Sequence, residues 1–374
     1  MSQTVSTVSD PKTSVKRVYN FSAGPAVLPL PVLEEAQRDL VALPGVGMSV
    51  MEISHRSKTF EDILNRAIAD MRELAGIPDT YRILMMQGGA SLQFSMVPMN
   101  LLSAGATADY VDTGTWADKA IKEAKKVGTV NITGSTKADK YNRIPAASEL
   151  ALTPGGAYVH ITTNNTIEGT EWKSLPETGE VPLVADASSD IFSAPIDVAR
   201  FGLIYAGAQK NLGPSGLTIV IVREDLLPRS SDALPMMMNY KVQAENNSLY
   251  NTPPTFGIYI LGLTMKWLKS LGGLNGIAAI NQRKAGKLYA EVDRTGFYRG
   301  TAQKDSRSLM NITFRLPSEE LEKMFDKEAT ANGLDGLKGH RSVGGMRASI
   351  YNAFPEAGVE TLVDFMREFE RKKG

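Results

Sequence analysis

From Val18 onward, short apolar runs alternate with stretches in which apolar and charged residues recur at helical spacing. Such alternation is typical of an α/β fold, in which strands and helices take turns along the chain. The pattern is clearest in residues 81–222, where several apolar runs end in Gly, Asp or Thr. The segments expected to be strands are residues 82–86, 108–112, 129–132, 157–162, 182–186, 203–206 and 217–222.

Helices are predicted between and after these strands. Residues 116–126 (WADKAIKEAKK) place alanines and Ile121 on one face and lysines on the other, as a surface helix does. Two prolines, Pro253 and Pro254, then interrupt the chain, and an apolar helix is expected at 256–271, where a Gly-Gly pair stops it. The elements expected after it are a helix at 278–294, a strand at 310–314 and helices at 318–332 and 358–371.

The length of 374 residues suits two domains. The first 17 residues are rich in Ser, Thr and Val and lack the apolar segment of a secretory signal. We therefore expect a flexible tail over residues 1–17, a large α/β domain over 18–272 and a small α+β domain over 273–374.

Composition narrows the functional classes. Forty-one Lys and Arg balance forty-one Asp and Glu, so the chain lacks the net positive charge of a nucleic-acid binder or of a polybasic membrane segment. An anion site must then be a local feature. The longest strongly apolar run, 217–222, is far short of the roughly 20 residues that span a bilayer.

Cysteine is absent, which excludes disulfides, thiolate nucleophiles, Cys-ligated zinc and iron–sulfur clusters. The three histidines, His55, His160 and His340, show no metal-ligand spacing, so no metal site is expected. These features are compatible with a reducing compartment, and we expect a cytoplasmic protein.

A possible phosphate site follows the first strand of the α/β region. Neither GxGxxG nor GxxxxGK[ST] occurs, but residues 87–91 (QGGAS) join a strand to a helical pattern. Such a turn exposes backbone N–H groups at a helix N-terminus, where the helix dipole favours an anion. The alternative is a tight turn with a Ser near the helix cap and no ligand.

Asp186 and Lys210 each follow an expected strand. In parallel α/β sheets ligands bind at the carboxyl ends of strands, so this acid and this amine could meet one small molecule. The alternative is that both side chains are simply solvated. Small residues and glycines surround Lys210 in AGAQKNLGPSG, where a flat ligand could approach and where desolvation would lower the pKa of the amine and favour Schiff-base chemistry.

A series of motifs extends this interpretation. FSAGPAVLP, SHRS, QGGAS, DTGTW, NNTIEGT, VADASSD, AGAQKNLGPSG, YNTPPTF and GHRSVGGMRASIYNA occur in this order from Phe21 almost to the C-terminus. In these motifs the chain resembles the phosphoserine aminotransferase family. The resemblance implies a pyridoxal-phosphate-dependent enzyme of fold type I, a homodimer with shared active sites. Its large domain would hold a mainly parallel seven-stranded sheet flanked by helices, with its first residues packed on a small α+β domain.

The resemblance also assigns cofactor residues. Lys210 would hold pyridoxal 5'-phosphate covalently and then serve as the base, while Asp186 would pair with the protonated pyridine nitrogen. Trp116 would stack on the ring; the alternative is that it packs the start of its helix. The remaining cofactor contacts implied are Thr166 near the phenolic oxygen, Ala90, Ser91 and Gln209 at the phosphate, and Asn251 and Thr252 from the other subunit.

Basic residues are implied in substrate recognition. The pairs His55-Arg56 and His340-Arg341 would bind the phosphate of phosphoserine or the γ-carboxylate of glutamate; by themselves, such pairs are more often solvated. Arg347 would bind the α-carboxylate, assisted by Ser22. Some family members carry an arginine where this chain has Ser91, so phosphate recognition here would rely more on the two His-Arg pairs. His160 is expected to be a core residue.

The activity implied is transamination between L-glutamate and 3-phosphohydroxypyruvate, giving 2-oxoglutarate and O-phospho-L-serine in serine biosynthesis. The same pocket could serve 4-phosphohydroxy-L-threonine in vitamin B6 biosynthesis. Cysteine desulfurase activity is excluded because its sulfur relay needs a cysteine. A non-catalytic dimeric relative is the other alternative, and the retention of Lys210, Asp186 and the arginines argues against it.

Overall fold

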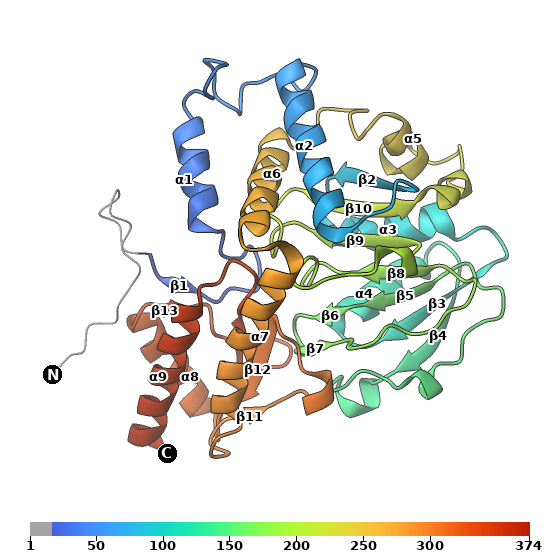
Figure 1. The fold of residues 1–374 in the computed structure, drawn as a ribbon. Coiled ribbons are helices and arrows are strands. Elements are labelled where there is room, and N and C mark those ends of the chain that lie inside the picture. Colours follow the sequence, from blue (N-terminus) through green and yellow to red (C-terminus); the bar gives the residue numbers. More distant parts are fainter. Residues whose placement is uncertain (1–16) are drawn as a thin grey trace.

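The computed structural model describes residues 17–374, so most of the expected tail lies outside the described residues. At its centre is a seven-stranded sheet with strand order β2-β10-β9-β8-β5-β3-β4 (Figure 1). Only β10 runs antiparallel to its neighbours. These strands are β2 (Tyr81–Met86), β3 (Thr107–Asp112), β4 (Thr129–Ser135), β5 (Val159–Thr162), β8 (Leu183–Asp186), β9 (Leu203–Gly207) and β10 (Thr218–Arg223). The predicted fold class and all seven predicted strands are confirmed, with differences only at strand ends.

The two faces of the sheet belong to different apolar cores because successive side chains of a strand point to opposite sides. In β2, Ile83 and Met85 pack in the core that contains α2 and α6, whereas Leu84 and Met86 pack in the core that contains α3 and α4. Both faces are buried, which explains why the strands appear as continuous apolar runs. The helices on these faces and beside them are α1 (Leu30–Asp39), α2 (Lys58–Ala75), α3 (Gly89–Leu101), α4 (Thr115–Ala124), α5 (Tyr240–Glu245) and α6 (Thr255–Ser270).

The C-terminal part of the chain builds a third core around a small antiparallel sheet of order β11-β12-β14. Its elements are α7 (Gly273–Val292), β11 (Arg299–Gly300), β12 (Asn311–Arg315), α8 (Glu319–Ala331), β13 (Leu334–Asp335), β14 (Met346–Ser349) and α9 (Glu356–Lys373). The expected helix at 278–294 begins earlier, because the left-handed Gly272 ends α6 and starts α7 without an intervening loop. The division of the chain at residues 272 and 273 stays a prediction.

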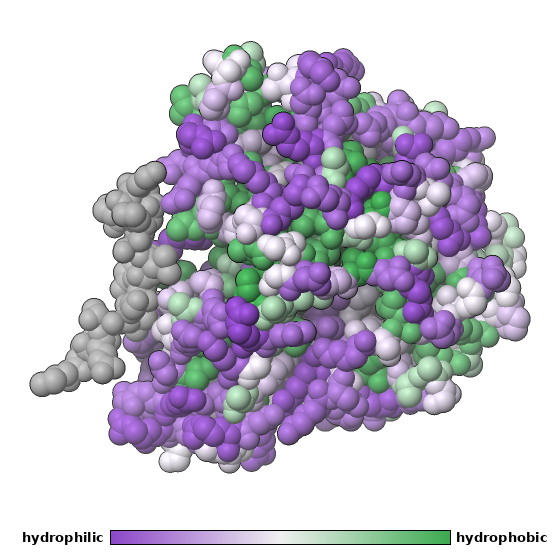
Figure 2. All heavy atoms as spheres, viewed as in Figure 1, coloured by the Kyte–Doolittle hydropathy of each residue, from purple (hydrophilic) through white to green (hydrophobic). Residues whose placement is uncertain are grey.

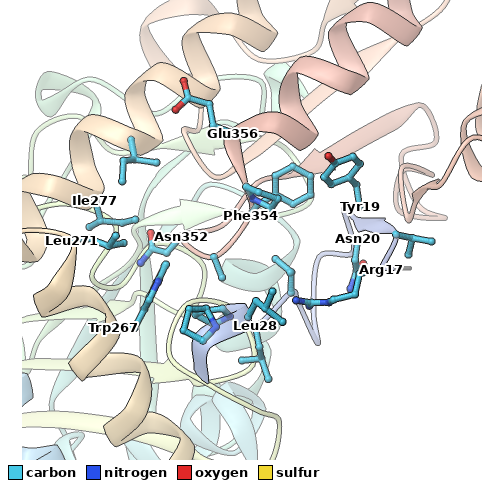
Figure 3. A pocket seen from close by; sticks show the side chains of 18 residues that line it. Arg17, Tyr19, Asn20, Leu28, Trp267, Leu271, Ile277, Asn352, Phe354 and Glu356 are labelled. Carbon is cyan, nitrogen blue, oxygen red and sulfur yellow. The ribbon is translucent and has the colours of Figure 1, made fainter. Parts of the chain in front are cut away.

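The start of the described chain joins this C-terminal part. The short strand β1 (Tyr19–Asn20) pairs in parallel with β13, and Tyr19 and Phe21 belong to the third core. A cavity of 290 Å³ lies at this junction, where Leu28 meets Trp267, Leu271 and Phe354 (Figure 3).

Hydrophilic side chains cover much of the face in Figure 2, with hydrophobic ones gathered toward its middle. Within residues 17–374, no helix is both long enough and apolar enough to cross a bilayer.

Candidate active site

The residues expected at the cofactor follow strands that end at one edge of the central sheet. Strands β2, β3, β5, β8 and β9 run in the same direction, so the segments after them emerge side by side. These segments carry the QGGAS turn, Trp116, Thr166, Asp186 and Lys210. This is the edge where parallel α/β sheets bind ligands.

Lys210 lies at the centre of this group. Its Nζ donates a hydrogen bond to Thr166 Oγ1 at 2.7 Å and lies 6.0 Å from the centroid of the Trp116 ring. Burial lowers the pKa of the amine to about 8; the negative charge of Asp186 opposes this shift and the positive charge of Arg347 adds to it. A lowered pKa makes the neutral, nucleophilic amine more accessible at neutral pH.

Asp186 is the last residue of β8 and is almost fully buried. Its Oδ1 accepts hydrogen bonds from the backbone N of Ser188 at 3.0 Å and from the Ser188 hydroxyl at 2.6 Å. Burial raises the pKa of this carboxyl, while the Ser188 hydrogen bond and the charge of Lys210 lower it. Within the described residues Oδ2 has no hydrogen-bond partner, so one carboxylate oxygen is held and the other is available.

Ser188 also links Asp186 to the strand that leads to Lys210, because its hydroxyl accepts a hydrogen bond from the backbone N of Gly207 at 3.1 Å. The N-terminal segment passes close by. The backbone N of Ala26 donates to the carbonyl of Gln209 at 2.8 Å, and a Cβ added at Gly24 would lie 3.5 Å from Cγ of Lys210. That distance is an ordinary contact, whereas the φ of +145° at Gly24 favours glycine at this position of the FSAGP motif.

Trp116 is the second residue of α4 and is half-buried, and Lys119 Nζ lies over its ring at 4.3 Å from the centroid. Its Nε1 is buried and has no hydrogen-bond partner in the described part of the chain. A residue outside α4 contacts the first residue of this helix. Glu168 Oε1 accepts hydrogen bonds from the backbone N and from Oγ1 of Thr115, at 2.8 and 2.7 Å.

The QGGAS turn leads into α3, which begins at Gly89 after the left-handed Gly88. Among the described residues no side chain caps this helix N-terminus; Ala90 is half-buried and Ser91 exposed. Gln87 Nε2 donates to the carbonyl of Thr252 of the same chain at 3.4 Å. The contribution of Asn251 and Thr252 to a second subunit stays a prediction.

Arg347, on β14, brings the C-terminal part of the chain to this edge. Its Nη1 donates to the carbonyl of Thr166 at 3.5 Å, and its Nε is buried without a partner among the described residues. Arg347 and His340 line a cavity of 810 Å³. Partial burial lowers the pKa of His340, and the positive charges of Arg347, Arg341 and Lys119 lower it further.

The two His-Arg pairs are not together in one chain. His55 and Arg56 lie in the connection between α1 and α2, at the opposite end of the molecule from β11 and β12, beside which His340 lies (Figure 1). Arg56 and Arg341 are both exposed. A single pocket that contains both pairs would therefore require a second copy of the chain.

Ser22 and His160 are the remaining candidate residues. Ser22 is half-buried, and its backbone N donates to Asn20 Oδ1 at 2.9 Å. His160 is buried in β5, where Nε2 lies 2.9 Å from the Tyr205 hydroxyl, as a core residue should be. Residues 17–374 contain no group of three or more His, Asp and Glu side chains that could hold a metal ion.

Three residues of the site were missed by sequence reasoning, although all three occur in the quoted motifs VADASSD, NNTIEGT and DTGTW. These are Ser188, Glu168 and Thr115. Their roles depend on contacts between strands that are distant in sequence, which no spacing reveals. The DTGTW motif contains Thr115 directly before Trp116, and that position at a helix start was the available signal.

Comparisons with known proteins agree with this geometry. The family model described as Aminotransferase class-V matches residues 18–362. The phosphoserine aminotransferase of Desulfosudis oleivorans is 58% identical over 361 residues, 96% of this chain and 99% of that protein. The structure of phosphoserine aminotransferase from Bacillus circulans subsp. alkalophilus matches with a TM-score of 0.94 and 54% identity, over 96% of this chain and 99% of that one. Another, from work on radiation damage of the Schiff base in phosphoserine aminotransferase, has a TM-score of 0.94 and 52% identity, over 96% of this chain and 100% of that one. The chain belongs to the phosphoserine aminotransferases, within the class-V aminotransferases.

Proposed function

We propose that the protein is a phosphoserine aminotransferase, which transfers the amino group of L-glutamate to 3-phosphohydroxypyruvate and so forms 2-oxoglutarate and O-phospho-L-serine. The observation that carries this proposal is the position of the Lys210 amine. It lies 2.7 Å from Thr166 Oγ1, has a pKa lowered to about 8, and is near both the buried Asp186 and Arg347.

The residues at the sheet edge fit pyridoxal 5'-phosphate. Lys210 offers an amine, Asp186 offers an oxygen without a hydrogen-bond partner in residues 17–374, and Trp116 offers a half-buried aromatic ring near Lys210. The uncapped N-terminus of α3, with Ala90 and Ser91, suits a phosphate, with Gln209 next to Lys210. When bound, the cofactor supplies an electron sink for the bond that breaks at Cα of the amino acid.

The chain's own residues would then act in distinct ways. Lys210 would hold the cofactor and afterwards take the proton from Cα of the substrate, because an amine with a pKa of about 8 can both accept and release a proton near neutral pH. Asp186 would keep the pyridine nitrogen protonated, and Ser188 would hold Asp186 in place. Thr166 would orient the Lys210 amine through their hydrogen bond.

Substrate recognition would rest on the basic residues. Arg347 would bind the α-carboxylate common to both amino acids, since its Nε is unpartnered and its charge lies beside Thr166. The phosphate or γ-carboxylate would bind the two His-Arg pairs, with Ser22 assisting at the carboxylate. Because the pairs lie apart in one chain, we propose a homodimer in which each site receives one pair, as well as Asn251 and Thr252, from the other subunit.

The test is the visible absorbance of the purified protein after addition of pyridoxal phosphate, recorded with O-phospho-L-serine and, separately, with L-alanine. We expect a visible band that phosphoserine removes and alanine does not, because only phosphoserine carries the distal anion. An equal response to both amino acids would contradict the proposed specificity. Failure to bind the cofactor would contradict the enzymatic function and favour a non-catalytic relative.

A further inference from the structure

Glu168 lies in the turn between β6 (Asn164–Asn165) and β7 (Thr170–Glu171) and is 7% exposed. Its Oε1 accepts both hydrogen bonds of Thr115 at the start of α4, in a place where Gly114 has no side chain to cap the helix. A Cβ added at Gly114 would lie 2.7 Å from Glu168 Oε2, so the glycine leaves room for the carboxylate. Glu168 therefore caps α4 from another segment of the chain.

The second oxygen of Glu168 has a different environment. Oε2 is buried and has no hydrogen-bond partner within the described residues, and neither has Nε of Arg347. Both residues line the same 810 Å³ cavity. Thr313 contacts both residues. It pairs with Arg347 across β12 and β14, and its Oγ1 donates a hydrogen bond to the Glu168 carbonyl at 3.1 Å.

These two side chains carry opposite charges and no ion pair joins them in the described part of the chain. An unpaired buried carboxylate oxygen and an unpaired buried guanidinium N–H are each unfavourable. Burial raises the pKa of Glu168, while the hydrogen bonds from Thr115 and the positive charge of Arg347 oppose this rise, and the charge of Glu168 in turn opposes the lowering of the Arg347 pKa by burial. A substrate carboxylate that binds Arg347 would therefore compete with Glu168 for the positive charge of this arginine.

We propose that Glu168 is a positioning residue that joins the two halves of the active site. Through Oε1 it fixes the first turn of α4, and with it Trp116. Through the charge on Oε2 it is the resident counter-charge of Arg347, which limits how tightly Arg347 holds a substrate or product carboxylate. The second role rests on the proposed function, in which Arg347 binds the α-carboxylate.

Glu168→Gln separates the two roles. The amide oxygen can still accept the Thr115 hydrogen bonds, but the negative charge near Arg347 is lost. We expect the dissociation constant of maleate, an unreactive dicarboxylate, to fall by about fivefold, the ratio expected for one screened charge pair. The KM values for L-glutamate and phosphoserine should fall similarly, with a smaller change in kcat. Glu123→Gln removes a charge from α4 itself, where Glu123 pairs with Lys126, and is the matched control; it should change neither the dissociation constant of maleate nor the KM values.

Glu168→Ala removes the cap as well as the charge. The melting temperature of the cofactor-free protein should fall by about 2 °C or more, whereas that of Glu168→Gln should stay near wild type. If Glu168→Ala does not fold, Thr115→Ala removes the hydroxyl contact alone and should lower the melting temperature less.

The outcomes distinguish the hypotheses. Unchanged or weaker maleate binding by Glu168→Gln would overturn the counter-charge role, and an unchanged melting temperature in both alanine variants would overturn the capping role. A wild-type protein that binds cofactor and maleate but does not turn over phosphoserine would contradict the proposed function alone, because the binding and melting measurements need no turnover.

Discussion

The edge of the central sheet that carries Lys210 and Asp186 differs from the two His-Arg pairs in how the fold holds the side chains. Lys210 follows β9, Asp186 ends β8 and Thr166 follows the short strand β6, and hydrogen bonds that involve Thr166 and Ser188 hold them in place. His55, Arg56 and Arg341 lie in connections between elements, and both arginines are exposed. Rigid strand ends can hold a reacting geometry, whereas loops can vary without disturbing it. We infer that the first region determines whether chemistry occurs and the second determines which substrate is used.

The largest effect should come from Lys210→Ala, which would remove both the proposed cofactor attachment and the proposed base. We expect kcat for the glutamate reaction to fall by at least about a thousandfold. The measurement is steady-state formation of 2-oxoglutarate with saturating pyridoxal phosphate. Lys122→Ala, an exposed lysine of α4, is the control and should retain wild-type activity. Retention of more than a few per cent of activity in Lys210→Ala would remove Lys210 from the centre of the site.

Asp186→Asn should have the next largest effect. The amide can keep the Ser188 contacts at Oδ1 but has no negative charge for the pyridine nitrogen. We expect kcat to fall by about a hundredfold, the usual loss when one preorganised electrostatic partner is removed. Unfolding should be measured in parallel, since loss of a buried charge changes stability as well. Normal kcat in a stably folded Asp186→Asn variant would show that the charge is not needed.

Arg347→Lys and Arg341→Lys should distinguish the two regions. Lysine cannot bind a carboxylate in the bidentate geometry of arginine, so Arg347→Lys should raise KM for both L-glutamate and phosphoserine by about tenfold. Arg341→Lys should raise KM for both as well, but more for phosphoserine, because its phosphate carries more negative charge than the γ-carboxylate of L-glutamate. If Arg341→Lys raises KM for both amino acids as strongly as Arg347→Lys does, the proposed difference between the two regions is wrong.

The smallest effect concerns pH. Burial lowers the pKa of Lys210 to about 8, so the neutral fraction of this amine rises as the pH rises through 8 and then levels off. The initial rate of covalent cofactor attachment to the cofactor-free protein should increase about fivefold from pH 7 to pH 8. Absorbance gives the rate, and borohydride reduction followed by peptide mapping identifies the lysine. Attachment at Lys284, whose amine is buried against three backbone carbonyls, would contradict the assignment.

The sequence predicted the central sheet well because its strands are buried on both faces and appear as apolar runs. It did not predict two-residue strands such as β1 and β13, which depend on pairing between distant segments. Helix α2 was not predicted either, although Phe60, Leu64 and Met71 recur at helical spacing. The sequence did predict the positions of Lys210 and Asp186, because each stands at the end of an expected strand. It did not predict the contacts of Ser188 and Glu168, because they depend on which strands become neighbours.

The pairing of β1 with β13 has a consequence for the order of folding. The segment that passes Lys210 is anchored on one side by Gln209 and on the other by a strand formed near the C-terminus. A nascent chain on the ribosome can complete the central sheet, yet β1 cannot pair with β13 until Leu334 and Asp335 have emerged. Contacts of such high sequence separation form late, because closing a long loop costs entropy before any pairing is gained. The segment beside Lys210 would thus lack one of its two anchors until synthesis of the chain is nearly finished.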